Sequence, residues 1–154
     1  MTITVIDSSA ILRLCFQEGD LSQLDMVMRD SPAISVLGAI EVPCAIAARF
    51  HRGQVNGSDR DRLLQVADEV LSVMLQLALT EDVKEEAVRI GKGFLVRTLD
   101  AVHIATAVVL AKQEQSSGGA VRFCTADIRQ ADVAIALFGK SQVDFVPPWR
   151  STSP

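Results

Sequence analysis

The hydrophobic positions along the chain alternate between short β-branched runs and longer stretches with helical spacing. Short apolar runs of this kind are typical of buried strands, and apolar residues recurring every three or four positions are typical of amphipathic helices. Five strands are predicted, at residues 2–6, 33–37, 77–80, 121–125 and 143–146. Helices are predicted between them, at residues 9–17, 39–50, 59–77, 81–95, 99–115 and 126–138.

Strands that alternate with helices predict a parallel sheet with helices on both of its faces. The fold class is therefore α/β, and 154 residues are enough for one domain with a single core. We assign residues 1–147 to this domain and residues 148–154 to a flexible C-terminal tail. In such folds ligands bind at the carboxyl ends of the strands.

Composition and charge narrow the possible partners. The chain is 49% hydrophobic but only 5% aromatic, which argues against a platform of aromatic rings for single-stranded nucleic acid. A formal net charge of −4 disfavours a module that binds polyanions through bulk positive charge. If the substrate is a nucleic acid, a local feature must attract it.

Cysteine usage and hydropathy indicate a cytoplasmic protein without a membrane span. Cys15, Cys44 and Cys124 are widely spaced, odd in number and surrounded by apolar residues, so we expect buried, reduced thiols. No basic segment precedes an apolar run at the N-terminus, and the longest uncharged stretches are too short to span a bilayer.

Two of the 19 acidic residues follow predicted strands directly. Asp7 comes after the first strand, and Asp127 follows the strand 121–125 in the same way. Both residues can be explained as helix caps, although Ser8 or Ser9 could cap the first helix instead of Asp7. A site role for either acid therefore depends on what lies near it.

Two further acids are isolated charges in apolar stretches. Glu41 is the only charged residue within 31–48, where an ionised carboxylate is costly unless it is paired or bound to a cation. Asp100 is the only formally charged residue within 98–111, where the helix dipole offers a structural explanation. His103 lies three residues after Asp100 on the same helix face, so the two are candidates for pairing.

Considered together, the four carboxylates predict a metal site. If Asp7, Glu41, Asp100 and Asp127 converge on one edge of the sheet, they need cations to stay ionised, because like charges raise each other's pKa. Mg²⁺ or Mn²⁺ suits oxygen ligands better than zinc does. Carboxylate-held metals of this kind promote phosphodiester hydrolysis. Basic side chains could form a rim for a nucleic-acid backbone, namely Arg49, Arg52, Arg60, Arg62, Arg89, Lys92 and Arg97.

With these residues identified, the chain resembles the PIN-domain family, and within it the VapC-like toxins of bacterial toxin–antitoxin pairs. The similarity runs through "VIDSSAIL", "SVLGAIEV", "LVRTLDAVHIATA" and "FCTADIRQADVAIALFG". It implies a three-layer α/β/α sandwich with a central parallel sheet of four to five strands. It also implies a Mg²⁺- or Mn²⁺-dependent endoribonuclease in which Asp7, Glu41, Asp100 and Asp127 are the catalytic acids and Ser9 supports them.

The resemblance also implies partners. A small antitoxin would cover the active site, the protein would be a homodimer, and the substrate would be a structured RNA such as transfer RNA or ribosomal RNA. Pro43 departs from the pattern, because proline is tolerated only in the first turn of a helix. Glu41 should therefore lie at the very start of its helix, or that helix should be kinked.

Three alternatives to the nuclease can be compared with the sequence, and two of them lack residues that they require. The chain could be a catalytically silent scaffold of the same fold that binds a protein or RNA without cleaving. Haloacid-type phosphatases require a second Asp two residues after the first, where this chain has Ser9. Receiver domains require an adjacent acid pair after the first strand and a late lysine after a strand, and neither is found.

Overall fold

Five parallel strands form the central sheet of the structure, a computed structural model that describes residues 1–147. The predicted tail at 148–154 lies outside the described residues. The strands are β1 (Thr2–Ile6), β2 (Ser31–Ser35), β3 (Leu75–Leu77), β4 (Ala120–Thr125) and β5 (Val143–Phe145). Their order across the sheet is β3-β2-β1-β4-β5. The predicted parallel sheet is confirmed.

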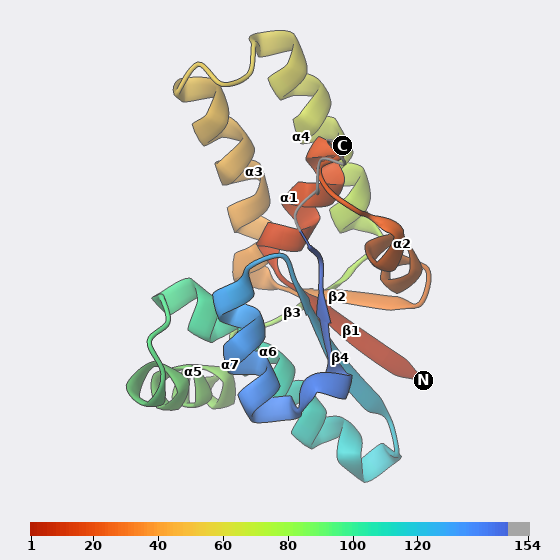
Figure 1. Ribbon diagram of the computed structural model, residues 1–154, viewed down its shortest axis with the longest axis vertical. Helices are drawn as coiled ribbons and strands as arrows, with labels where there is room; N and C mark the ends of the chain where they lie inside the picture. Colours follow the sequence, from red (N-terminus) through yellow and green to blue (C-terminus); the bar gives the residue numbers. More distant parts are fainter. Residues whose placement is uncertain (148–154) are drawn as a thin grey trace, which may run out of the picture.

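Helices cover both faces of this sheet (Figure 1). They are α1 (Ser8–Phe16), α2 (Ser22–Met28), α3 (Val36–His51), α4 (Gly57–Ser72), α5 (Glu81–Gly93), α6 (Thr98–Glu114) and α7 (Ile128–Phe138). One apolar core joins the sheet to α5, α6 and α7, and a second joins it to α1, α2, α3 and α4. None of the helices in residues 1–147 is both long enough and apolar enough to cross a membrane.

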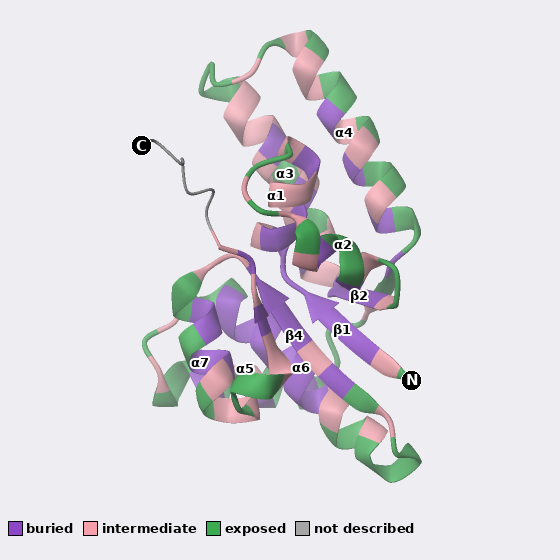
Figure 2. Cartoon of the chain, turned by 45° about the vertical axis from the view of Figure 1, so that its right-hand side comes forward, coloured by how far each residue is buried: buried purple, intermediate pink, exposed green. Residues whose placement is uncertain are grey.

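Alternation along the strands explains the two cores. Ile3 and Val5 of β1 belong to the core under α5, α6 and α7, whereas Ile6 belongs to the core on the opposite face. Successive side chains of a strand point to opposite faces, so a strand covered by helices on both sides is apolar throughout. The central strands are accordingly buried, while α4 exposes one side to solvent (Figure 2).

The strand order determines where a ligand can bind. The chain goes from β1 to β2 on one side, and β4 pairs with the other side of β1. The connections leaving β1 and β4 therefore diverge, and such a switch point opens a crevice at the carboxyl ends of the strands. Asp7 follows β1 directly at this point, and its backbone N–H donates to the Cys124 carbonyl of β4.

Several boundaries differ from the prediction. The second strand is Ser31–Ser35 rather than 33–37, because the Ser35 side chain accepts from the Gly38 N–H and starts α3 early. The third strand is Leu75–Leu77 rather than 77–80. The short helix α2, which buries Leu24 and Val27, was not predicted because its seven residues are too few to show a clear period.

The prediction of buried, reduced thiols is correct for two of the three cysteines. Cys44 is exposed on α3, whereas Cys15 and Cys124 are buried free thiols as expected. Apolar neighbours in sequence do not decide which side of a helix faces solvent, and that explains the error.

Pro43 lies inside α3, seven residues after the first residue of the helix, Val36. Glu41 is thus not at the very start of its helix, and the first explanation offered for Pro43 is wrong. Proline lacks an N–H, so the carbonyl of Ala39, four residues earlier, receives no helical hydrogen bond from Pro43. The helix nevertheless continues to His51.

Candidate metal-binding edge

Asp7 is the most enclosed of the predicted acids, with no exposed surface. It caps α1 by accepting from the Ala10 N–H at 3.1 Å. The Ser9 hydroxyl donates to its two oxygens at 2.8 and 2.9 Å, and the Thr125 hydroxyl donates to Oδ2 at 3.0 Å. Burial raises the pKa of Asp7, and these neutral donors offset only part of that effect.

Ser9 and Thr125 join the two strand exits. The Ser9 hydroxyl accepts from the Ala126 N–H at 3.1 Å, and the Thr125 hydroxyl accepts from the Asp127 N–H at 3.0 Å. Each side chain therefore links Asp7 to the turn that carries Asp127. Ser9 was a predicted supporting residue. Thr125 was not among the predicted site residues, although its place two residues before Asp127 was visible in the sequence.

Glu41 is held from two directions by neighbours outside its own helix. Its Oε2 accepts from the Ser8 hydroxyl at 2.6 Å and lies 2.8 Å from His103 Nε2. His103 Nδ1 lies 2.9 Å from the Ser35 hydroxyl. A neutral imidazole satisfies both contacts when Ser35 donates to Nδ1 and Nε2–H donates to Glu41. The contact with His103 lowers the pKa of Glu41 below its ordinary value.

The predicted pairing of His103 with Asp100 is wrong. Asp100 lies in the first turn of α6 and is buried, and its partners are Arg97 and Gln130. Arg97 Nε donates to Oδ2 at 2.9 Å, and Gln130 Nε2 donates to Oδ1 at 2.9 Å. His103 is one helical turn further along and contacts α3 instead, which the spacing within α6 alone could not reveal.

Asp127 caps α7 and lies beside the same arginine. Its Oδ1 accepts from the Arg129 N–H at 2.8 Å, and its Oδ2 is 3.8 Å from Arg97 Nη2. The positive charge of Arg97 also contributes to the lowered pKa of Glu41. One guanidinium therefore acts on three of the four predicted acids. The sequence placed Arg97 on an outer rim, whereas the structure places it among the carboxylates.

The four acids are connected through their partners. Thr125 links Asp7 to Asp127, and Arg97 links Asp127 to Asp100. Glu41 joins this edge through Ser8 on α1 and His103 on α6.

The donor chemistry of this edge fits a hard divalent cation. Carboxylate oxygens are the ligands that Mg²⁺ and Mn²⁺ take, and buried Asp7 has no positive partner in direct contact within residues 1–147. Gln130 Oε1 beside Asp100 is buried without a hydrogen-bond partner, so it can accept a bond from a ligand or water. In the described residues, however, no three Asp, Glu, His or Cys side chains are already grouped as a metal cluster. Arg97 supplies the counter-charge instead.

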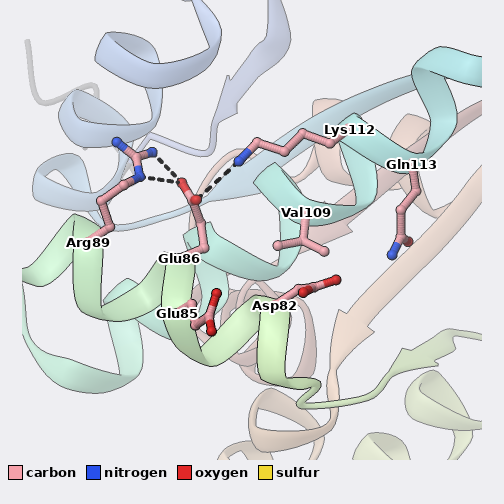
Figure 3. A pocket seen from close by; sticks show the side chains of 7 residues that line it. All are labelled: Asp82, Glu85, Glu86, Arg89, Val109, Lys112 and Gln113. Atoms are coloured by element: carbon pink, nitrogen blue, oxygen red, sulfur yellow. Dashed lines mark hydrogen bonds and ion pairs between the residues drawn. The ribbon is translucent and has the colours of Figure 1, made fainter.

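Three other predicted rim residues lie away from this edge. Arg60 pairs with Asp61 and Arg62 with Asp59 on α4, while Arg89 pairs with Glu86 on α5. Figure 3 shows the surroundings of Arg89, where side chains of α5 and α6 line a cavity of about 480 Å³. These arginines do not form one rim.

A cleft of about 430 Å³ opens directly beside the carboxylate edge. We call it the arginine cleft, because three arginines from α1, α3 and α7 line it together with Ser9 and Asp127. Its lining consists of Ser9, Leu12, Arg13, Glu18, Arg49, Ala126, Asp127, Ile128 and Arg129.

Comparison with solved structures finds a similar fold in chains of toxin–antitoxin complexes. No protein-family model and no curated protein matches the sequence. A chain of a toxin–antitoxin complex from Klebsiella pneumoniae is similar, with TM-score 0.59, 16% identity, and coverage of 91% of this chain and 94% of that chain. A chain of VapBC2 from Rickettsia felis, bound to a promoter DNA fragment, has TM-score 0.61 and 11% identity, covering 96% and 99%.

A chain of VapBC-5 from Mycobacterium tuberculosis has TM-score 0.61 and 20% identity, covering 94% of this chain and 98% of that chain. At these identities the likeness concerns the fold alone. It confirms the predicted fold class, a three-layer α/β/α sandwich of the PIN-like type with five parallel strands.

Proposed function

We propose that this chain is the toxin of a toxin–antitoxin pair and acts as a metal-dependent endoribonuclease. The observation that carries the proposal is Asp7, a fully buried carboxylate at the switch point of the sheet that is held only by neutral donors. Asp100 and Asp127 lie on the same edge, connected to it through Arg97 and Thr125. A cation at this edge would remove the cost of burying Asp7.

Each of these residues would have a distinct role in metal binding or hydrolysis. Asp7, Asp100 and Asp127 would hold Mg²⁺ or Mn²⁺, and Glu41 would complete the ligand shell or position the attacking water. The bound metal would supply charge stabilisation for an in-line displacement at phosphorus. Ser9 and Thr125 keep the Asp7 carboxylate in one orientation, and His103 does the same for Glu41.

The partners are part of the same proposal. The similar structures are toxin–antitoxin complexes, which supports an antitoxin that covers this edge. The substrate would be a structured RNA such as transfer RNA or ribosomal RNA, and the working unit a homodimer in the cytoplasm.

An RNA-cleavage assay tests the proposal. Purified wild type should cleave RNA with Mg²⁺ or Mn²⁺ and be inactive in EDTA. Asp7→Asn and Asp100→Asn should each lower the cleavage rate at least about 100-fold, which exceeds the effect of replacing a residue that only orients a metal ligand. The alternative is a silent scaffold, which the absence of a ready-made metal cluster within residues 1–147 favours. A wild type that is inert with both metals, with both variants still binding a partner, would establish the scaffold.

A further inference from the structure

We propose that the arginine cleft is a nucleotide subsite, where Arg13 and Arg129 contact phosphates of the RNA strand next to the scissile bond. The inference deepens the proposed function and rests on it for the identity of the polymer. It names a binding surface separate from the carboxylates that would hold the metal.

The position of the cleft makes it a continuation of the metal edge. Ser9 and Asp127 belong both to the edge and to the lining of the cleft. A phosphate placed at the edge would thus have its neighbouring nucleotide in the cleft. The volume of about 430 Å³ lies in the range of about 300–1,000 Å³ that is typical of small-ligand sites.

The arginines of the cleft are available to a new partner. Arg13 forms no ion pair within residues 1–147, and its guanidinium has a long hydrogen bond of 3.4 Å to the Pro147 carbonyl. The Arg129 side chain is 76% exposed, with Nε 3.8 Å from Asp127. Arg49 pairs with Glu18 at 3.2 Å and its guanidinium lies 3.7 Å from the centre of the Phe16 ring, so Arg13 and Arg129 are the more available of the three.

The remaining lining suits a nucleotide better than a bare anion. The lining includes Ile128, which exposes 56% of its surface, and the half-buried Leu12, so a base can lie against apolar groups. The cleft also lies at the start of the 11-residue helix α7, where the Asp127 carboxylate already accepts from the Arg129 N–H, so the arginine side chains and not the helix N–H groups would bind phosphate.

Charge explains why a local subsite is needed at all. The chain carries a formal net charge of −4, so RNA is not attracted by the surface as a whole. In the cleft three arginines face only Glu18 and Asp127. If Asp127 also binds a cation, the balance becomes more positive.

Binding without metal tests the subsite separately from catalysis. In EDTA, fluorescence anisotropy of a labelled 12-nucleotide single-stranded RNA is measured against KCl concentration for wild type, Arg13→Gln and Arg129→Gln. Each variant should weaken RNA binding about threefold to tenfold. It should also lower the slope of log affinity against log salt by about 0.7, the change expected when one phosphate contact to a single strand is lost. The control Arg62→Gln removes an exposed arginine of α4 and should leave the slope unchanged.

The outcomes are distinct. Wild type without salt-dependent RNA binding, or cleft variants with the slope of Arg62→Gln, would overturn the subsite. If the variants lose affinity for a poly-glutamate peptide but not for RNA, the cleft is a protein-binding surface and the proposal is wrong. If RNA binds as expected but is not cleaved with Mg²⁺ or Mn²⁺, the subsite stands and the proposed nuclease fails. Arg129→Lys should restore the slope, because it keeps the charge.

Discussion

Glu86 and Asp7 are both buried acids, but the protein stabilises them in opposite ways. Glu86 on α5 is bound by the guanidinium of Arg89, one turn away, and by Lys112 of α6 at 3.1 Å (Figure 3). Asp7 is bound by two hydroxyls and an N–H, all neutral. The pKa of Glu86 is lowered, first by its hydrogen bond to Arg89, whereas burial raises the pKa of Asp7.

The difference sets an acid paired within the structure apart from the acid that is the candidate for a site. The charge of Glu86 is compensated within the two helices that it joins, so nothing else is needed at that position. Asp7 has no cation in direct contact within residues 1–147, and it lies at the switch point of the sheet, where β1 and β4 end side by side. A buried charge without a counter-charge costs stability, which makes Asp7, and not Glu86, the candidate for a site acid.

Among the residues that hold the acids in place, the largest effect is expected from Thr125, whose hydroxyl donates to Asp7. Thr125→Val keeps the shape but removes the bond to Asp7 and leaves the Asp127 N–H without its acceptor. Mn²⁺ affinity, measured by calorimetry, should fall about 10- to 100-fold, as for other residues that orient metal ligands.

The control for that measurement is Thr106→Val. Thr106 is equally buried but donates to the Val102 carbonyl within α6, away from the acids. Equal Mn²⁺ affinities for the two variants would show that Thr125 only fills space.

Stability should change in opposite directions at the two acids. In EDTA at neutral pH, Glu86→Gln should lower the free energy of unfolding by about 1.5 kcal/mol, a low value because Arg89 and Lys112 are largely exposed. Asp7→Asn should raise it, because the neutral amide removes the cost of burying an ionised carboxylate. Urea unfolding measures both changes, and a destabilised Asp7→Asn would remove the contrast.

The effect at Glu86 should also depend on pH. Its pKa in the folded state lies below the ordinary value of 4.5, so its stabilisation is complete above pH 4.5 and is lost as the pH falls through the folded-state pKa. Unfolding free energies of wild type and Glu86→Gln should therefore converge in acid. A difference that stays constant from pH 7 to pH 3 would mean that packing, and not charge, stabilises Glu86.

The sequence predicted the sheet and the four acids better than it predicted their partners. Asp7 and Asp127 follow apolar strands directly, so their arrival at one edge follows from parallel topology. The partner of His103 lies 62 residues away on α3, and the partners of Arg97 come from the start of α6 and from the turn before α7. Arg97–Asp100 is a three-residue spacing that the sequence could have suggested, whereas the contacts of His103 with Glu41 and of Arg97 with Asp127 depend on how elements far apart in sequence pack.

The smallest effect is expected from Arg97, which provides the counter-charge that the metal would replace. Its guanidinium lies 2.9 Å from Asp100 and 3.8 Å from Asp127, so a cation bound by these acids must compete with it. Arg97→Gln should therefore bind Mn²⁺ about fivefold more tightly, or about 1 kcal/mol. Arg89→Gln is the matched control, because Arg89 also pairs with an acid three residues away and is similarly exposed. Weaker binding in Arg97→Gln alone would mean that Arg97 organises the acids for the metal and does not compete with it.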